Sequence, residues 1–274
     1  MKVNEDRIAN YFNYITNQSS TDVGCTRLSY SIEDLKVRMY IMDELKSIGA
    51  EVKIDSVGNI RAKYNPDNLK TKSLLIGSHI DTVPFGGRYD GLTGSVCSLE
   101  VLKTLHENDI KLKHPVELVI FAEEEGSNFG VTMVGSKYMT GKLSLDDLKN
   151  LYTDEGETAY EYIQSRGIDF HPEKDYFANG KDELGMIELH VEQGGILDKK
   201  GLSLGIVEAI TGMNTLQVIV QGVSNHAGTT PMNYRKDSLL AASEMIYKLS
   251  KIAHDYETAV ITVGKVKFHP MHPM

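Results

Sequence analysis

The chain has 274 residues, and its hydrophobic fraction of 41% and charged fraction of 24% are those of a globular protein with a full core. Its formal net charge of −9 argues against nucleic acid as a partner, because an acidic surface repels a phosphate backbone. The two cysteines, Cys25 and Cys97, have no CxxC spacing and predict reduced thiols in a cytoplasmic protein. No apolar run approaches membrane-spanning length, so we expect no membrane partner.

The N-terminal part of the chain predicts two helices and a hairpin. Apolar residues at helical spacing predict an amphipathic helix over residues 4–17 (Ile8, Tyr11, Phe12 and Ile15). A second helix is expected to begin at Ser31, with acidic residues in its first turn, and to end near Gly49. Residues 52–63 alternate apolar and polar side chains around a Gly-Asn turn and predict a β-hairpin.

The first chemical signal follows a buried strand. The apolar run at residues 74–76 predicts a strand of a parallel sheet, and open α/β sheets bind ligands at the carboxyl ends of their strands. His79 and Asp81 stand where this strand should end, and Asp90 follows before a helix expected over residues 92–105. His79 is a candidate metal ligand, Asp90 could bridge two cations, and Asp81 is placed to orient a ligand or to tune a neighbouring acid. From these residues alone, a hydrogen-bonded histidine with loop aspartates is an equally good interpretation.

A second apolar run, residues 116–121, leads into three adjacent carboxylates, Glu123, Glu124 and Glu125. Neighbouring carboxylates repel each other and lose solvation when buried, and a bound cation would relieve that repulsion. One carboxylate could bind the metal while its neighbour acts as a general base on water. The alternative is a solvated acidic turn, which is less attractive because this is the second apolar strand to end in candidate ligands.

The third signal is weaker when taken alone. Residues 127–150 are expected to be partly helical, and residues 151–182 are expected to form a helix-and-loop insertion. A strand predicted over residues 186–189 then meets His190, and Gln193 could orient this histidine or contact a substrate. A single histidine in such a place is more often structural than catalytic.

Together these residues form a constellation of candidate metal ligands: His79, Asp90, Glu124 or Glu125, and His190. Mixed nitrogen and carboxylate ligands favour Zn²⁺, Mn²⁺ or Co²⁺ over Ca²⁺ or Mg²⁺. A bridging aspartate with further ligands on each side predicts two metal ions, roughly 3.5–4 Å apart. This inference rests on ligand type and on placement at strand ends.

The last part of the chain predicts further elements around a polar loop. Residues 216–220 alternate like an edge strand, and residues 236–253 have the apolar spacing of an amphipathic helix. Residues 258–266 predict another strand. The loop at residues 222–232 carries His226, which on its own is best interpreted as an exposed loop residue.

Five motifs, in order along the chain, carry a resemblance to one group of enzymes. They are Gly-Ser-His79-Ile-Asp81-Thr-Val-Pro, Gly-Arg-Tyr-Asp90-Gly, Glu-Glu124-Glu125-Gly-Ser, Glu-Leu-His190-Val-Glu-Gln-Gly and Asn-His226-Ala-Gly-Thr-Thr-Pro-Met. The chain resembles the allantoate amidohydrolase, N-carbamoyl-L-amino-acid hydrolase and β-ureidopropionase branch of the aminoacylase/carboxypeptidase-G superfamily. The resemblance extends from Ser31 to Val266 and is specific to the branch, not to one substrate.

The resemblance implies an α/β fold in two parts. Residues 1–211 would form a zinc-exopeptidase-like catalytic domain, with a central, mostly parallel sheet flanked by helices. Residues 212–274 would form part of a small α+β lid domain, through which two copies of the chain would pair as a homodimer.

The resemblance also implies two divalent metals, Zn or Mn with Co also suited, and roles for the site residues. The implied metal ligands are His79, Asp90 as the bridge, Glu125 and His190. Glu124 would be the general base, and Asp81 would be the carboxylate behind the metal site. His226 would reach the partner subunit's site to stabilise the oxyanion and contact substrate. Gln193 is a further candidate for a substrate contact, on its position after His190 and not on the resemblance.

The implied reaction is hydrolysis of a linear C–N bond in a small ureido or carbamoyl compound, by water that the metals activate and Glu124 deprotonates. Allantoate, a carbamoyl amino acid and 3-ureidopropionate are all open as substrates. A dimetal aminopeptidase or aminoacylase is an alternative within the superfamily.

The C-terminus departs from the family's pattern. The family continues with the rest of the lid, a substrate-binding arginine and a final histidine ligand, whereas this chain ends in a Pro-rich tail with His269 and His272. We therefore expect a C-terminally truncated chain, in which the tail histidines could bind metal adventitiously. A catalytically inactive, metal-binding fragment is the second hypothesis.

Overall fold

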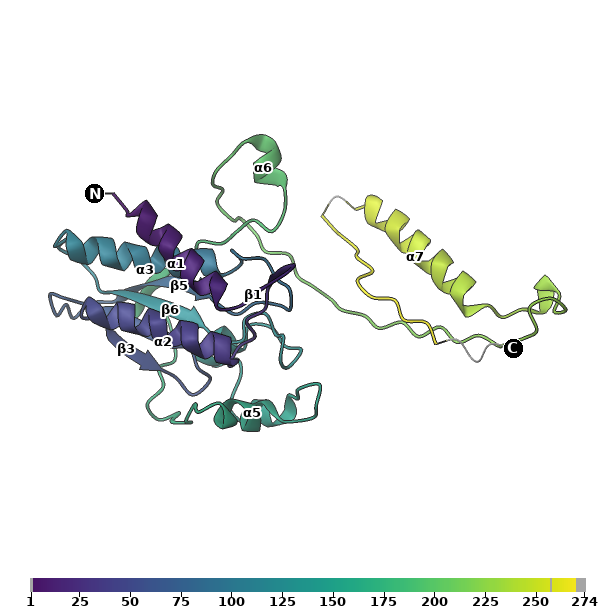
Figure 1. Ribbon diagram of the computed structural model, residues 1–274, viewed down its shortest axis with the longest axis horizontal. Helices are drawn as coiled ribbons and strands as arrows, with labels where there is room; N and C mark the ends of the chain where they lie inside the picture. Colours follow the sequence, from purple (N-terminus) through teal and green to yellow (C-terminus); the bar gives the residue numbers. More distant parts are fainter. Residues whose placement is uncertain (1, 257, 270–274) are drawn as a thin grey trace. The chain divides into compact units, whose positions relative to one another are not determined.

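A computed structural model describes residues 2–256 and 258–269, so His272 of the tail lies outside the described residues. The chain divides into two compact units, residues 1–205 and residues 206–274. Each unit has its own secondary structure (Figure 1). Among the described residues, no helix combines the length and the apolar composition that crossing a membrane requires.

A five-stranded mixed sheet is the centre of the first unit. Its strand order is β3 (Glu51–Ile54), β4 (Ile60–Tyr64), β6 (Val116–Phe121), β5 (Ser73–His79) and β7 (Glu183–Ile187). β5 runs parallel to both β6 and β7, whereas β4 runs antiparallel to β3 and β6. The predicted α/β class with a helix-flanked central sheet is confirmed, and the expected parallel arrangement holds for the three strands that lead to candidate ligands.

The parallel strands bring their carboxyl ends to one edge of the sheet. His79, the last residue of β5, pairs with Phe121, the last residue of β6. β7 begins at Glu183, earlier than the predicted strand, because Glu183 pairs with Ser73 at the start of β5. The segments that follow β5, β6 and β7 therefore start at the same edge.

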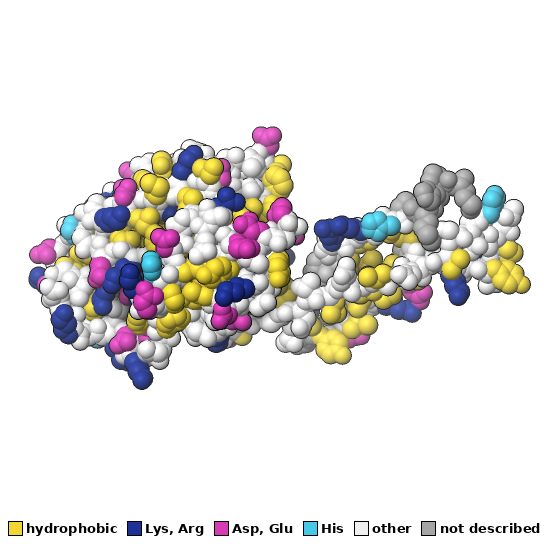
Figure 2. Space-filling view, turned by 90° about the horizontal axis from the view of Figure 1, so that it is seen from below, with side chains coloured by type: hydrophobic (Ala, Val, Ile, Leu, Met, Phe, Trp, Pro, Cys, Tyr) yellow, Lys and Arg dark blue, Asp and Glu magenta, His cyan; other side chains and the backbone are white. Residues whose placement is uncertain are grey.

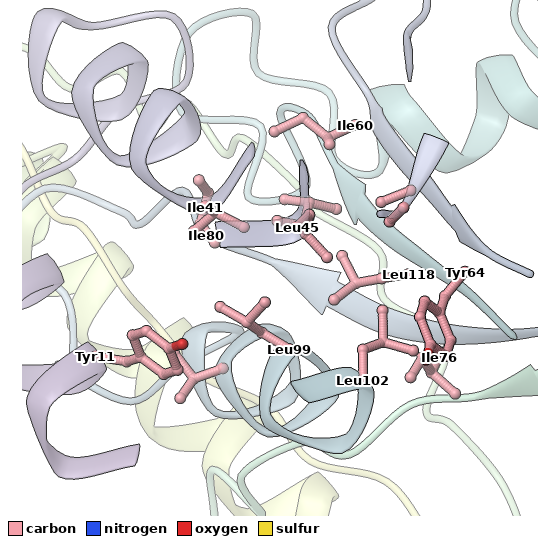
Figure 3. Close-up of a cluster of buried hydrophobic side chains, with 14 of the residues drawn as sticks. Tyr11, Ile41, Leu45, Ile60, Tyr64, Ile76, Ile80, Leu99, Leu102 and Leu118 are labelled. Atoms are coloured by element: carbon pink, nitrogen blue, oxygen red, sulfur yellow. The ribbon is translucent and has the colours of Figure 1, made fainter. Parts of the chain in front are cut away.

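Three helices cover one face of the sheet: α1 (Glu5–Asn17), α2 (Ile32–Ser47) and α3 (Leu92–Glu107), which confirms the helices predicted there. The side chains of Asn4 and Ser31 cap the first two helices by accepting backbone N–H groups of the first turn. Alternate strand residues point to this face and pack with the helices in one core, shown in Figure 3 (Ile60, Ile76 and Leu118).

On the opposite face, α4 (Val134–Met139) supplies Met139 to a small core with Leu75 and Val119. The 3₁₀ helix η1 (Asp147–Asn150) and α5 (Ala159–Ser165) belong to a separate core cluster, which includes Ala122 from the loop after β6. The helix-and-loop character predicted for this region is confirmed. A short hairpin of β1 (Ser20–Thr21) and β2 (Gly24–Cys25) lies between α1 and α2 in the chain.

The second unit contains the 3₁₀ helix η2 (Met232–Tyr234) and helix α7 (Ser238–His254), and α7 confirms the predicted helix. The strands predicted over residues 216–220 and 258–266 are wrong, because both segments lack strand pairing in the described part of this unit. A strand needs a neighbour to satisfy its backbone, and the backbone pairing found here is an isolated bridge between Val223 and Lys236. Figure 2 shows hydrophobic side chains on the surface of this unit, and those of α7 include Leu239, Leu240 and Met245.

Candidate metal centre

His79 ends β5, and its buried imidazole lies against the loop that carries Asp90. Gly91 makes this close approach feasible: its φ is +60°, and a Cβ at this position would lie 2.5 Å from Cδ2 of His79. The imidazole also stacks on that of His190, with ring centroids 5.8 Å apart and ring planes at 29°. The loop backbone at position 91 therefore requires glycine, and the close approach brings Asp90 beside the imidazole.

Asp90 and His190 complete a cluster with His79. One potential ligand atom from each of the three residues lies within 4.8 Å of the other two. Oδ1 of Asp90 is 3.3 Å from Nε2 of His190, whose Nδ1 is 2.8 Å from the carbonyl oxygen of Val191. A metal-binding histidine is commonly oriented in this way, by an oxygen at the nitrogen that does not bind the metal.

Asp81 connects His79 to the loop after β6. Nδ1 of His79 lies 3.0 Å from the backbone carbonyl oxygen of Asp81 and 3.7 Å from its carboxylate Oδ1. The other carboxylate oxygen of Asp81 accepts the backbone N–H of Glu125 at 3.1 Å. On the opposite side of the imidazole, Nε2 of His79 lies 3.7 Å from Oε2 of Glu124. Asp81 is thus placed to orient both the histidine and the glutamate loop.

Two carboxylate oxygens at the site have no hydrogen-bond donor among the described residues, and a bound cation could take that place. Oδ1 of Asp81 and Oδ1 of Asp90 are buried and accept no hydrogen bond from any residue that the structure describes. A buried carboxylate oxygen without a donor is destabilising, and a divalent cation would compensate the charge of Asp90. Two imidazoles and a carboxylate are also a donor set that suits Zn²⁺ or Mn²⁺. The residues present therefore fit the predicted metal.

The ionisation of the side chains reflects a strongly negative site. Burial lowers the pKa of His79, but the negative charges of Asp81, Glu124 and Glu125 raise it to about 9. Burial raises the pKa of Glu124, an effect that His79 opposes and Asp81 reinforces. Burial also raises the pKa of Glu125 to about 7; His79 opposes this shift, and the charges of Asp90 and Glu124 add to it. Such a concentration of acidic groups favours a bound cation.

The segment after β7 is tied to the rest of the site by side-chain hydrogen bonds. Nε2 of Gln193 donates to Oδ2 of Asp90 at 2.8 Å. Ser78 Oγ donates to Oε1 of Glu188 at 2.6 Å. This bond connects the segment that precedes His190 to β5. Glu192 accepts the first N–H groups of helix α6 (Ile196–Lys200). Gln193 therefore lies beside the cluster, and its predicted contact with substrate stays a prediction.

His226 belongs to the second unit, where it is exposed in a loop. Its Nδ1 accepts the backbone N–H groups of Gly228 and Thr229 at 3.1 and 3.2 Å, so the loop itself fixes the ring. Its predicted roles in oxyanion stabilisation and substrate binding stay predictions.

Sequence reasoning missed residues 25–29, a segment that hydrogen-bonds to the loops after β5 and β6. Nε of Arg27 donates to the carbonyl oxygen of Ile80 at 2.7 Å, and Oγ of Ser29 accepts the N–H of Glu123 at 2.7 Å. Both side chains are buried. An irregular segment has no periodicity, and a single serine or arginine is no motif, so the sequence carried no signal that could have found them.

Comparison with known proteins gives concordant matches. Residues 75–270 match the model of peptidase family M20/M25/M40. An N-carbamoyl-L-amino-acid amidohydrolase of Paenarthrobacter aurescens is 31% identical over 98% of this chain and 66% of its own length. An allantoate amidohydrolase of Escherichia coli (strain K12) is 36% identical over 90% of this chain and 60% of its own length. A crystal structure of an amidase of the hydantoinase/carbamoylase family from Burkholderia multivorans has a TM-score of 0.79 and 30% identity, covering 99% of this chain and 66% of that one.

These matches concern part of a longer architecture, because the chain spans between 52% and 66% of the length of such curated relatives. The family model begins within β5 and extends over β6, β7, the candidate ligands and most of the second unit, whereas the relative from Paenarthrobacter aurescens also matches nearly all of the chain before it. The chain belongs to peptidase family M20/M25/M40, and within it resembles the amidohydrolases of ureido and carbamoyl compounds.

Proposed function

We propose that the chain carries the metal centre and the general base of an amidohydrolase that cleaves a linear C–N bond in ureido or carbamoyl compounds. The observation that supports this most directly is the cluster of His79, Asp90 and His190 beside Glu124. The similarity to an N-carbamoyl-L-amino-acid amidohydrolase and to an allantoate amidohydrolase supports a small ureido or carbamoyl molecule as the substrate class.

His79, Asp90, Glu125 and His190 would hold two divalent cations, Zn²⁺ or Mn²⁺. When bound, these ions would lower the pKa of the attacking water and stabilise the negative charge that develops on the substrate oxygen. Asp81 would keep His79 oriented through its contacts with Nδ1, which are 3.0 Å for the backbone oxygen and 3.7 Å for the carboxylate. The unpartnered, buried Oδ1 of Asp90 supports its role as a ligand.

Glu124 would act as the general base. Its side chain is partly buried and lies 3.7 Å from Nε2 of His79, and burial raises its pKa. A carboxylate with a raised pKa is a stronger proton acceptor. Glu124 would take a proton from water as the water oxygen bonds to the substrate carbon. It would then give this proton to the leaving nitrogen as the C–N bond breaks.

Gln193 and His226 are the proposed substrate contacts. Gln193 lies beside Asp90, at 2.8 Å. His226 would donate to the oxyanion from a partner copy, in a homodimer formed through the second unit. The exposed hydrophobic side chains of α7 support an interface in this unit. Sedimentation of the purified chain tests the dimer, and a monomer at every concentration would refute it.

Metal content and ammonia release test the proposed function. The chain should be purified without chelator, supplied with Mn²⁺ or Zn²⁺, and assayed with allantoate and with N-carbamoyl amino acids. Two metals per chain together with ammonia release would support the proposal. A chain that binds no metal, or that binds metal and releases no ammonia from any of these compounds, would refute it for this chain.

Replacement of the base separates metal binding from turnover. Glu124→Gln should keep the metal content and lower kcat by about 10²–10⁴-fold, because it removes the proton acceptor and preserves the shape of the side chain. Glu155→Gln is the matched control, since Glu155 is an exposed acid in the α5 region. Full activity of the Glu124→Gln variant would show that Glu124 is not the base.

A further inference from the structure

Glu123, the second residue of the loop after β6, has an unfavourable backbone conformation. Its φ is +51°, in the left-handed region that a residue with a Cβ seldom adopts. Such a conformation persists only where the surroundings hold it in place. Part of that hold comes from its own buried carboxylate, which accepts the backbone N–H of Asn128 at 2.7 Å and the side-chain amide of Asn128 at 2.6 Å.

Ser29 stabilises the backbone of Glu123 through a hydrogen bond. Its Oγ accepts the N–H of Glu123 at 2.7 Å, and its carbonyl oxygen accepts the side-chain amide of Asn128 at 3.0 Å. Ser29 is fully buried. Its contacts therefore join a segment before α2 to the loop after β6, without any hydrogen bond to a candidate ligand among the described residues.

Glu123, whose N–H Ser29 accepts, directly precedes Glu124 in the chain. After it, the carbonyl oxygen of Glu124 accepts the N–H of Met133 at 2.7 Å, and the N–H of Glu125 donates to Asp81 at 3.1 Å. The backbone of Glu124 is thus held on both sides. Its carboxylate is directed toward His79, with 3.7 Å between Oε2 and Nε2.

The same segment also holds the loop after β5. The N–H of Arg27 donates to Oγ1 of Thr82 at 2.9 Å, and the N–H of Thr82 donates back to the carbonyl oxygen of Arg27 at 2.9 Å. The side chain of Arg27 adds the bond to Ile80, the residue between His79 and Asp81. One segment therefore fixes the loop that follows His79 and the loop that carries Glu124 relative to each other.

We propose that Ser29 is a positioning residue for Glu124, an inference that rests on the proposed function. By accepting the N–H of Glu123, Ser29 holds the left-handed turn that sets the direction of the Glu124 carboxylate. Without the hydroxyl, the buried N–H loses its acceptor and the turn loses one of its anchors. The cluster of His79, Asp90 and His190 contains no residue of that turn.

Ser29→Ala and Ser56→Ala form a matched pair for the test. Ser56 is also buried, and its Oγ also accepts a backbone N–H from a distant segment, that of His171 at 2.9 Å. Each substitution deletes one such acceptor and adds no atom. Both should lower Tm by a similar amount, about 5 °C. Ser29→Ala alone should lower kcat, by about 10–100-fold, with KM within about twofold of wild type.

Hydrogen–deuterium exchange gives a readout that needs no substrate. Ser29→Ala should accelerate exchange at the amides of residues 123–134, and Ser56→Ala should not. A wild-type kcat in Ser29→Ala, or an equal loss of kcat in Ser56→Ala, would overturn the inference, as would unchanged exchange in residues 123–134. Failure of the proposed function is distinct, because the wild-type chain itself would then release no ammonia.

Discussion

Replacing Gly91 by alanine should disrupt metal binding while leaving the first unit folded. The added Cβ would lie 2.5 Å from Cδ2 of His79, and the imidazole is buried and cannot move freely into solvent. Ordinary carbon–carbon contacts are about 3.5–4.0 Å, so either the ring or the loop must shift by about 1 Å. The φ of +60° at this position adds strain of about 1–3 kcal/mol for a residue with a Cβ.

A shift of about 1 Å is large for a metal ligand, since ligand distances are held to within about 0.2 Å. Even changes to residues that only orient ligands weaken metal affinity by about 10–100-fold. We therefore expect Gly91→Ala to raise the dissociation constant for Zn²⁺ or Mn²⁺ by at least about tenfold. A competition titration with a chromophoric chelator measures this directly, in the absence of any substrate.

Gly87→Ala is the control from the same loop, because a Cβ on Gly87 would meet no atom within 4 Å. It should bind metal with an affinity within about twofold of wild type, and circular dichroism should show both variants folded. Wild-type affinity in Gly91→Ala would refute the packing argument. An equal loss in Gly87→Ala would show that loop composition, not contact with His79, is responsible.

Two further predictions concern buried charges away from the site. Arg38→Met should lower the free energy of unfolding by about 3–5 kcal/mol in urea denaturation, because it leaves the buried carboxylate of Asp34 without the guanidinium that lies 2.6 Å away; wild-type stability would contradict this. Burial raises the pKa of Asp55 from its ordinary value of 3.8 to about 6, although the hydrogen bonds from Asn59 oppose this shift. The folded chain therefore binds the proton of Asp55 more tightly than the unfolded chain does. The resulting stabilisation is full below the unfolded pKa and is lost as pH rises through about 6, so it should be about 2 kcal/mol larger at about pH 4.5 than at about pH 7.5. Asp55→Asn should remove this part of the pH dependence, and equal pH dependence in both chains would count against it.

The edge of the sheet that carries the candidate site could be predicted from sequence because two physical signals coincide there. The apolar runs that become β5 and β6 are each followed, within three residues, by ligand-type residues. Parallel strands then place those residues at one edge, and the pairing of His79 with Phe121 aligns the two ends. The parallel pairing of these two strands is sufficient to predict that His79 and Glu124 lie near each other.

The remaining features depend on pairings between distant segments, which periodicity does not encode. The position of β4 between β3 and β6 makes the sheet mixed, and nothing in the alternation of residues 52–63 indicates which strand β4 joins. Residues 216–220 have a strand-like pattern, yet a pattern cannot supply the neighbour that a strand requires. The contact of Ser29 with Glu123 joins residues 94 positions apart and is equally absent from local sequence.

Left-handed backbone occurs next to candidate site residues in each of the three loops at this edge. Gly91 follows Asp90, Glu123 precedes Glu124, and Gln193 itself has a φ of +58° while it donates to Asp90. Each turn stands beside or at a polar residue of the candidate site: Asp90 belongs to the cluster, Glu124 lies 3.7 Å from His79, and Gln193 donates to Asp90. Only one of the three is a glycine, so the other two conformations need external support of the kind that Ser29 gives Glu123. Strain that persists at two places beside one cluster, with glycine at the third, is best explained by a requirement for side-chain direction, and the Gly91 and Ser29 variants test two of these turns independently.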